Sequence, residues 1–88
     1  MIYADEESCK AAGIDPKKVE SLARRLDKLG KQAEKMGLFI FGGSGAGTLR
    51  TNEEYEHGQI VVGFIGGGGT WDGGDGGVRE IDGVQYGE

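Results

Sequence analysis

The fold is decided by residues 15–41, which read DPKKVESLARRLDKLGKQAEKMGLFIF. Apolar side chains recur through this stretch at alternating steps of three and four residues: Val19, Leu22, Leu26, Leu29, Ala33 and Met36. That spacing places them along one side of an α-helix and leaves the other sides to charged residues. We therefore predict a long amphipathic helix over residues 15–37.

Both ends of this helix carry residues that favour helix termini. Asp15 can accept hydrogen bonds from the first free amides, and Pro16 is tolerated at the first helical position. Gly37 can adopt the left-handed conformation that ends a helix. Upstream, the segment 1–14 predicts a short helix from Asp5 to Ala12, closed by Gly13.

After Gly37 the pattern changes to that of β-strands. Short runs rich in apolar and β-branched residues at 38–41, 48–51 and 60–65 predict a meander of three strands over residues 38–65. Near the end, Asp82-Gly83 suits the two-residue turn of a hairpin, which we place within residues 78–88.

Together these elements predict a single α+β domain spanning residues 1–88. A short N-terminal helix and one long amphipathic helix would pack on a small antiparallel sheet of three strands, with a terminal hairpin.

The predicted strands are apolar on both sides. Phe39 and Phe41 alternate with Leu38 and Ile40 in the first strand, and Ile60, Val62 and Phe64 alternate with Val61 and Ile65 in the third. One helix cannot cover both faces of a sheet. Either the N-terminal segment and the Trp71 region cover the far face, or a second subunit or a partner protein does. The candidate interaction residues are therefore Leu38, Ile40, Val61, Ile65 and Trp71.

Residues 66–77 form a glycine-rich loop, with eight glycines in twelve positions. Ordering such a chain costs much backbone entropy and buries little surface, so we expect it to be mobile unless something fixes it. Trp71 is the side chain most able to do so, by docking on the sheet or on a partner.

Composition limits the kinds of site and the cellular compartment that this chain can have. The single cysteine, Cys9, excludes an internal disulfide and any zinc site built on paired thiolates. No run approaches the length of a membrane helix, and the N-terminus lacks the pattern of a signal peptide, so we expect a cytoplasmic protein without a membrane partner. The net charge is −5, yet residues 16–36 alone carry +4 and residues 37–88 carry −6. A basic helix thus sits in an acidic chain.

Three patterns suggest chemistry, and each has a simpler interpretation. The glycines of 42–47 resemble an anion-binding turn with Arg50 as a helper, but the chain continues as a strand rather than a helix. Asp72 and Asp75 are too few for a calcium loop. His57 has no second histidine with which to bind a metal. We predict no enzyme activity, no cofactor and no metal.

The N-terminal half also fits a helix-turn-helix template. Cys9, Gly13 and Ile14 occupy the positions of its first helix and turn, and Val19 and Leu22 those of apolar anchors in the second helix. A nucleic-acid face would then consist of Lys17, Lys18, Arg24, Arg25 and Lys28. The alternative is that the spacing reflects amphipathic packing and that the charges are a solvated face.

Three stretches, residues 13–26, 36–50 and 72–77, resemble small bacteriophage and prophage proteins of unassigned function. The resemblance implies a bacterial cell or a virion as the setting, and no catalytic residue to transfer. Our first hypothesis is a non-enzymatic interaction or structural accessory module that self-associates. The alternatives are a small DNA-binding regulator that uses the basic helix 17–35 and, third, an anion or nucleotide binder at the Gly42–Gly47 turn.

Overall fold

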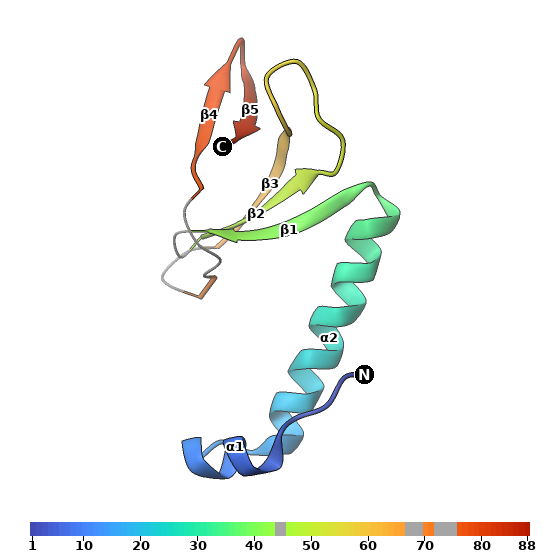
Figure 1. Ribbon diagram of the computed structural model, residues 1–88, viewed down its shortest axis with the longest axis vertical. Coiled ribbons are helices and arrows are strands. Elements are labelled where there is room, and N and C mark those ends of the chain that lie inside the picture. The colour runs from blue at the N-terminus through green and yellow to red at the C-terminus, as the bar shows by residue number, and fades with distance from the viewer. Residues whose placement is uncertain (44–45, 67–69, 72–75) are drawn as a thin grey trace. The chain divides into compact units, whose positions relative to one another are not determined.

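The computed structural model describes residues 1–43, 46–66, 70–71 and 76–88. Its elements, in chain order, are two helices and five strands (Figure 1): α1 (Glu6–Ala12), α2 (Pro16–Lys35), β1 (Leu38–Gly43), β2 (Ala46–Thr51), β3 (Val61–Ile65), β4 (Val78–Ile81) and β5 (Val84–Gly87). The predicted α+β class is confirmed. The chain divides into two compact units, Met1–Gln32 and Ala33–Glu88. The packing of the long helix on the sheet, and a single domain over residues 1–88, stay predictions.

In the first unit, α1 is closed at both ends by local hydrogen bonds. Asp5 adopts an extended conformation, and its carboxylate accepts a hydrogen bond from the amide of Ser8 at 3.2 Å. Gly13 is left-handed, with φ of 73°, and the amide of Ile14 donates to the carbonyl of Cys9 at 2.9 Å. Cys9 is the buried residue of this helix. The predicted short helix and its glycine stop are confirmed.

The ends of α2 also follow the sequence. The Asp15 carboxylate accepts from the amide of Lys17 at 2.9 Å, which satisfies one of the free donors at the helix start. The helix ends at Lys35, and Gly37 follows in the left-handed conformation with φ of 74°. A non-glycine residue there would be strained, so Gly37 ends the helix where the sequence predicted.

The second unit is built on an antiparallel sheet in the order β1-β2-β3 (Figure 1). In β1, Phe39 lies opposite Arg50 and Phe41 opposite Thr48, so these four side chains share one face, which we call the hairpin face. Ile40 lies opposite Leu49 on the other face, which we call the open face. The hairpin face is so named because the ends of the hairpin formed by β4 and β5 contact Arg50 on that side of the sheet.

A β-bulge in β3 changes which side chains share a face. Arg50 pairs with Val61, but Leu49 pairs with Gly63, so Val62 is an extra residue without a partner. Val61 therefore points to the hairpin face, whereas Ile65, opposite Gly47, points to the open face. Our grouping of Val61 and Ile65 on one face is wrong, because strict alternation does not continue through a bulge.

The hairpin of β4 and β5 closes over one face of the sheet. Its turn is Asp82-Gly83, with φ of 52° and 81°, as the sequence predicted. Tyr86 bridges to Ile60 at the start of β3, and the amide of Gly87 donates to the carbonyl of Gln59 at 2.8 Å. Val61 and Tyr86 are buried beneath this contact, together with the polar residues Thr48 and Arg50.

Candidate functional site

Arg50 lies at the centre of the second unit and is 3% exposed. Its Nε donates to Thr48 Oγ1 at 3.0 Å, and its Nη2 donates to the carbonyl of Gly77 at 3.1 Å. Its Nη1 donates to the carbonyl of Glu88 at 3.4 Å. The guanidinium also lies 4.0 Å from the centre of the Phe41 ring, within range of a cation–π interaction.

These contacts assign Arg50 a structural role. Gly77 and Glu88 flank the terminal hairpin, so the guanidinium ties both ends of the hairpin to the sheet. Burial removes water from the charged group and lowers the pKa of Arg50. An arginine remains protonated despite such a shift, so the charge stays and must be solvated by carbonyls and the aromatic ring. The expected use of Arg50 as a helper for an anion at the Gly42–Gly47 turn is not what the structure shows, because its donors face backbone carbonyls.

Glycine at two positions permits this close arrangement. A side chain built at Gly87 would collide with the guanidinium of Arg50, and one built at Gly76 would collide with the ring of Phe41. The chain thus uses glycines of its C-terminal region to bring backbone against a large cation and an aromatic ring.

The open face holds four of the five predicted interaction residues. Leu38, Ile40 and Ile65 are half-buried there, and so is Trp71, whose ring lies against Gly47. A Cβ atom at Gly47 would come within 3.1 Å of the indole and 3.3 Å of Ile65. Trp71 is therefore docked on the sheet, one of the two outcomes expected for it. Val61, the fifth residue, is buried on the hairpin face instead.

Sequence reasoning missed two exposed apolar side chains of β3. Val62, the extra residue of the bulge, and Phe64 are 54% and 68% exposed. Phe64 shares the hairpin face with Thr48, yet it stays exposed while Val61 on that face is buried. Gly63, an isolated glycine within the strand pattern, is a local signal for a bulge, but only the strand register shows that Val62 is the extra residue.

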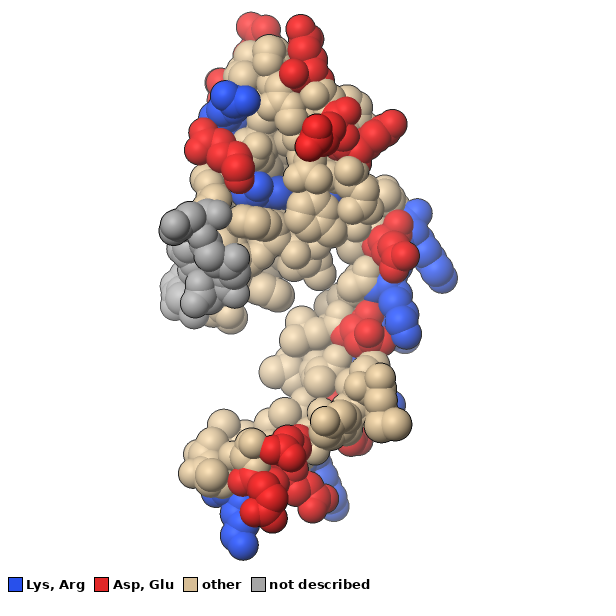
Figure 2. Space-filling model, viewed as in Figure 1, with Lys and Arg blue, Asp and Glu red and all other residues tan. Residues whose placement is uncertain are grey.

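The candidate nucleic-acid residues Lys17, Lys18, Arg24, Arg25 and Lys28 are all exposed on α2. Arg24 forms an ion pair with Glu20 at 3.5 Å, and Lys31 forms one with Asp27 at 3.1 Å, both along the helix surface. Figure 2 shows Lys and Arg side chains along α2 and acidic side chains gathered over the β4–β5 hairpin and the loop after β2. Acidic side chains also stand among the basic ones along α2, so this helix does not present a uniformly basic surface.

His57 takes part in packing. Its ring meets the ring of Tyr86 edge to face, with centroids 5.3 Å apart, and its carbonyl accepts from Arg79 at 3.1 Å. Among the described residues, no group of three or more His, Cys, Asp or Glu side chains could hold a metal ion. Asp72 and Asp75, and residues 44–45 of the predicted anion turn, lie outside the described residues.

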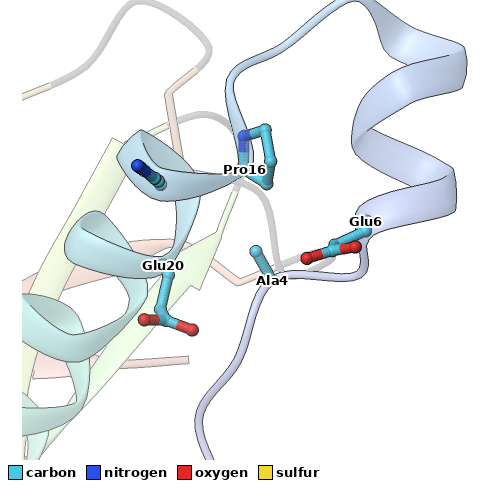
Figure 3. Close-up of a pocket in the computed structure, with 5 residues that line it drawn as sticks. Ala4, Glu6, Pro16 and Glu20 are labelled. Carbon is cyan, nitrogen blue, oxygen red and sulfur yellow. The ribbon is translucent and has the colours of Figure 1, made fainter.

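The first unit has a shallow pocket of about 160 Å³ (Figure 3). Its lining consists of Ala4, Glu6, Pro16, Lys17 and Glu20. In Figure 3 the carboxylates of Glu6 and Glu20 come from different segments, the start of α1 and the first turns of α2. The ionisable side chains of this set are two carboxylates and the amine of Lys17, and Glu6 and Lys17 are exposed, so the pocket assigns no reaction class.

In comparisons with known proteins, no protein family, curated protein or solved structure matches the chain. In the part of the chain that the structure describes, no helix is long and apolar enough to cross a membrane.

Proposed function

We propose that this chain is a non-enzymatic protein-interaction or structural accessory module, of the kind that phage and prophage genomes encode, and that it self-associates. The observation that supports this proposal most strongly is the contrast between the two faces of one small sheet. Both faces carry large apolar side chains, and the chain buries them to different extents.

On the hairpin face, Val61 and Tyr86 are buried and Arg50 ties the hairpin down, whereas Phe64, which pairs with Thr48, stays exposed. On the open face, Leu38, Ile40 and Ile65 remain half-buried beside Trp71. Apolar surface that stays in water costs free energy, at about 25 cal/mol per Å². A partner that covers the open face would recover this free energy, and contiguous apolar patches of this kind mark interaction sites.

Sedimentation velocity over a wide range of protein concentration tests this proposal. We expect a reversible dimer or higher oligomer, and we expect Ile40→Ser to weaken it by about tenfold, because burying one such side chain contributes about 1.5–3 kcal/mol. The matched control is Val62→Ser, which alters an equally apolar but unpaired residue of the bulge. A wild-type protein that stays monomeric at every concentration would contradict self-association.

A second candidate function, DNA binding by a small regulator, is favoured by the exposure of every basic side chain in the set from Lys17 to Lys28. Lys and Arg contacts with phosphates make such binding strongly dependent on salt. Fluorescence anisotropy with a labelled duplex would show binding at low salt that Arg24→Glu together with Arg25→Glu removes. No binding at low salt disposes of this candidate.

A further inference from the structure

The apolar stripe of α2 has the spacing of a two-stranded coiled coil. Steps of three and four residues average 3.5, which is the repeat that keeps one seam facing a partner helix. Its leucines are exposed in the structure: Leu22, Leu26 and Leu29 are 50%, 41% and 54% exposed. Ala33, further along the same stripe, is already buried. Within the first unit, the stripe left uncovered therefore consists of Leu22, Leu26 and Leu29, with the half-buried Val19 at its start, and we call these four residues the seam.

The two sides of this seam carry opposite chemistry. On one side Lys18 and Arg25 each precede a seam residue, and we call them the basic flank. On the other side the residues next to the seam are small, Ala23 and Gly30. Immediately behind these small residues, one step further around the helix, lies the acidic flank: Glu20, Asp27 and Glu34.

This asymmetry distinguishes the two ways in which two copies of α2 can pair. In an antiparallel pair, identical flanks meet, so that basic faces basic and acidic faces acidic. In a parallel pair, the basic flank of each helix meets the acidic flank of the other. Like charges across an interface are unfavourable and opposite charges are favourable, so the charges select the parallel pair.

We infer that α2 pairs in parallel and in register with α2 of a second copy of this chain, through the seam Val19 to Leu29. This inference rests on the proposed self-association, and it adds to the open face of the sheet a second contact surface with a defined orientation. Lys18 then reaches across Ala23 of the second copy towards Glu20 and Asp27 there. Arg25 reaches across Gly30 of the second copy towards Asp27 and Glu34. The small residues let these long side chains pass.

The ion pairs already present within α2 are compatible with this arrangement. Arg24 and Lys31, which bind Glu20 and Asp27, lie on the side of the helix away from the seam. The side chains of Glu20 and Asp27 remain 44% and 36% exposed, so their carboxylates can accept a further donor. Because the seam is short, the pair should form reversibly and depend on concentration.

The test compares two double variants of equal charge change by sedimentation velocity. Lys18→Glu with Arg25→Glu places acids on the basic flank, opposite the acidic flank of the second copy. The matched control, Lys17→Glu with Arg24→Glu, makes the same charge change on the side away from the seam. We expect the flank variant to dissociate at about tenfold higher concentration than the control, since several exposed ion pairs become repulsive.

A mixing experiment makes the result specific. The variant Glu20→Lys with Asp27→Lys should also lose self-association, and mixing it with the flank variant should restore a one-to-one dimer, because acids then face lysines on both sides. Circular dichroism of each variant checks that α2 is still helical. If either variant loses helicity, the orientation test below decides the matter.

Orientation is tested by oxidising Leu29→Cys in a Cys9→Ala background. A parallel pair in register places the two introduced thiols together, so a disulfide-linked dimer should form readily. An antiparallel pair would hold the two thiols apart, so the same oxidation would give no disulfide-linked dimer, and that result would overturn the inference.

The failure of this inference is distinguishable from that of the proposed function. A wild-type dimer that responds to Ile40→Ser but not to the flank variant would overturn the helical pairing and leave self-association through the sheet. A wild-type monomer at all concentrations would overturn both.

Discussion

The two units of this chain hold their apolar side chains in different ways. In the second unit, Val61 and Tyr86 are buried around the charged group of Arg50. In the first unit, Cys9 is buried while Leu22 and Leu29 remain about half exposed. A small unit that leaves its largest side chains in water gains little from the hydrophobic effect, so its helices depend on caps and ion pairs or on a partner. The difference shows which apolar side chains each unit covers by itself and which it leaves exposed.

The largest expected effect that sharpens this comparison comes from Arg50→Met. It removes three hydrogen bonds, so that the carbonyl of Glu88 loses its Arg50 donor and that of Gly77 keeps only the amide of Glu88. We expect a loss of about 3 kcal/mol in the free energy of unfolding of the second unit. Urea denaturation measures the loss, and amide hydrogen exchange should show it in β4 and β5. Arg79→Met, at an exposed site, should have little effect. Equal losses of stability for the two variants would refute the structural role assigned to Arg50.

A smaller loss is expected from Gly47→Ala, because the added methyl would lie 3.1 Å from the Trp71 ring. Overpacking of this kind costs about 1 kcal/mol or more. Since Trp71 is the chain's only tryptophan, its fluorescence reports the change directly, and the emission should shift to longer wavelength. The control is Gly66→Ala, where an added methyl meets nothing within 4 Å. Unchanged emission in both variants would mean that Trp71 is not docked on Gly47.

In the first unit, we expect the hydrogen bond at the start of α2 to contribute to the stability of the helix. Asp15→Ala removes the acceptor for the amide of Lys17 and should cost about 1 kcal/mol of helix stability. Circular dichroism at the helix band, followed during thermal unfolding, measures this loss. Ser21→Ala, in the exposed middle of the same helix, serves as the control, and an equal effect there would show that the cap contributes nothing.

The smallest effect is expected from Leu22→Ala in dilute, monomeric protein. An exposed leucine contributes within about 0.5 kcal/mol to the stability of a chain that leaves it in water. Val61→Ala, at a buried site of the second unit, should cost about 2 kcal/mol by comparison. Thermal or urea denaturation compares the two. If Leu22→Ala cost as much as Val61→Ala, the stripe would be covered by the chain's own residues, and the comparison between the units would fail.

Most of the secondary structure could be predicted because its determinants are local. Asp15, Gly13 and Gly37 act on amides and dihedral angles within one helical turn, and Asp82-Gly83 sets its turn alone. Gly63 could have suggested a bulge in the third strand, but its position at Val62 could not be predicted, since it depends on how β3 meets β2 across the sheet. The role of Arg50 was missed for the same reason, because its acceptors lie at Gly77 and Glu88, far along the chain.

The unpaired Val62 also bears on how this sheet can tolerate insertions and deletions. In most strands, losing one residue turns every later side chain to the opposite side. In β3, Gly63 already pairs with Leu49, the neighbour of Arg50, so a chain without Val62 would keep each remaining cross-strand partner and a regular ladder. This strand can therefore lose one amino acid and still present the same pattern, a tolerance that ordinary strands do not have.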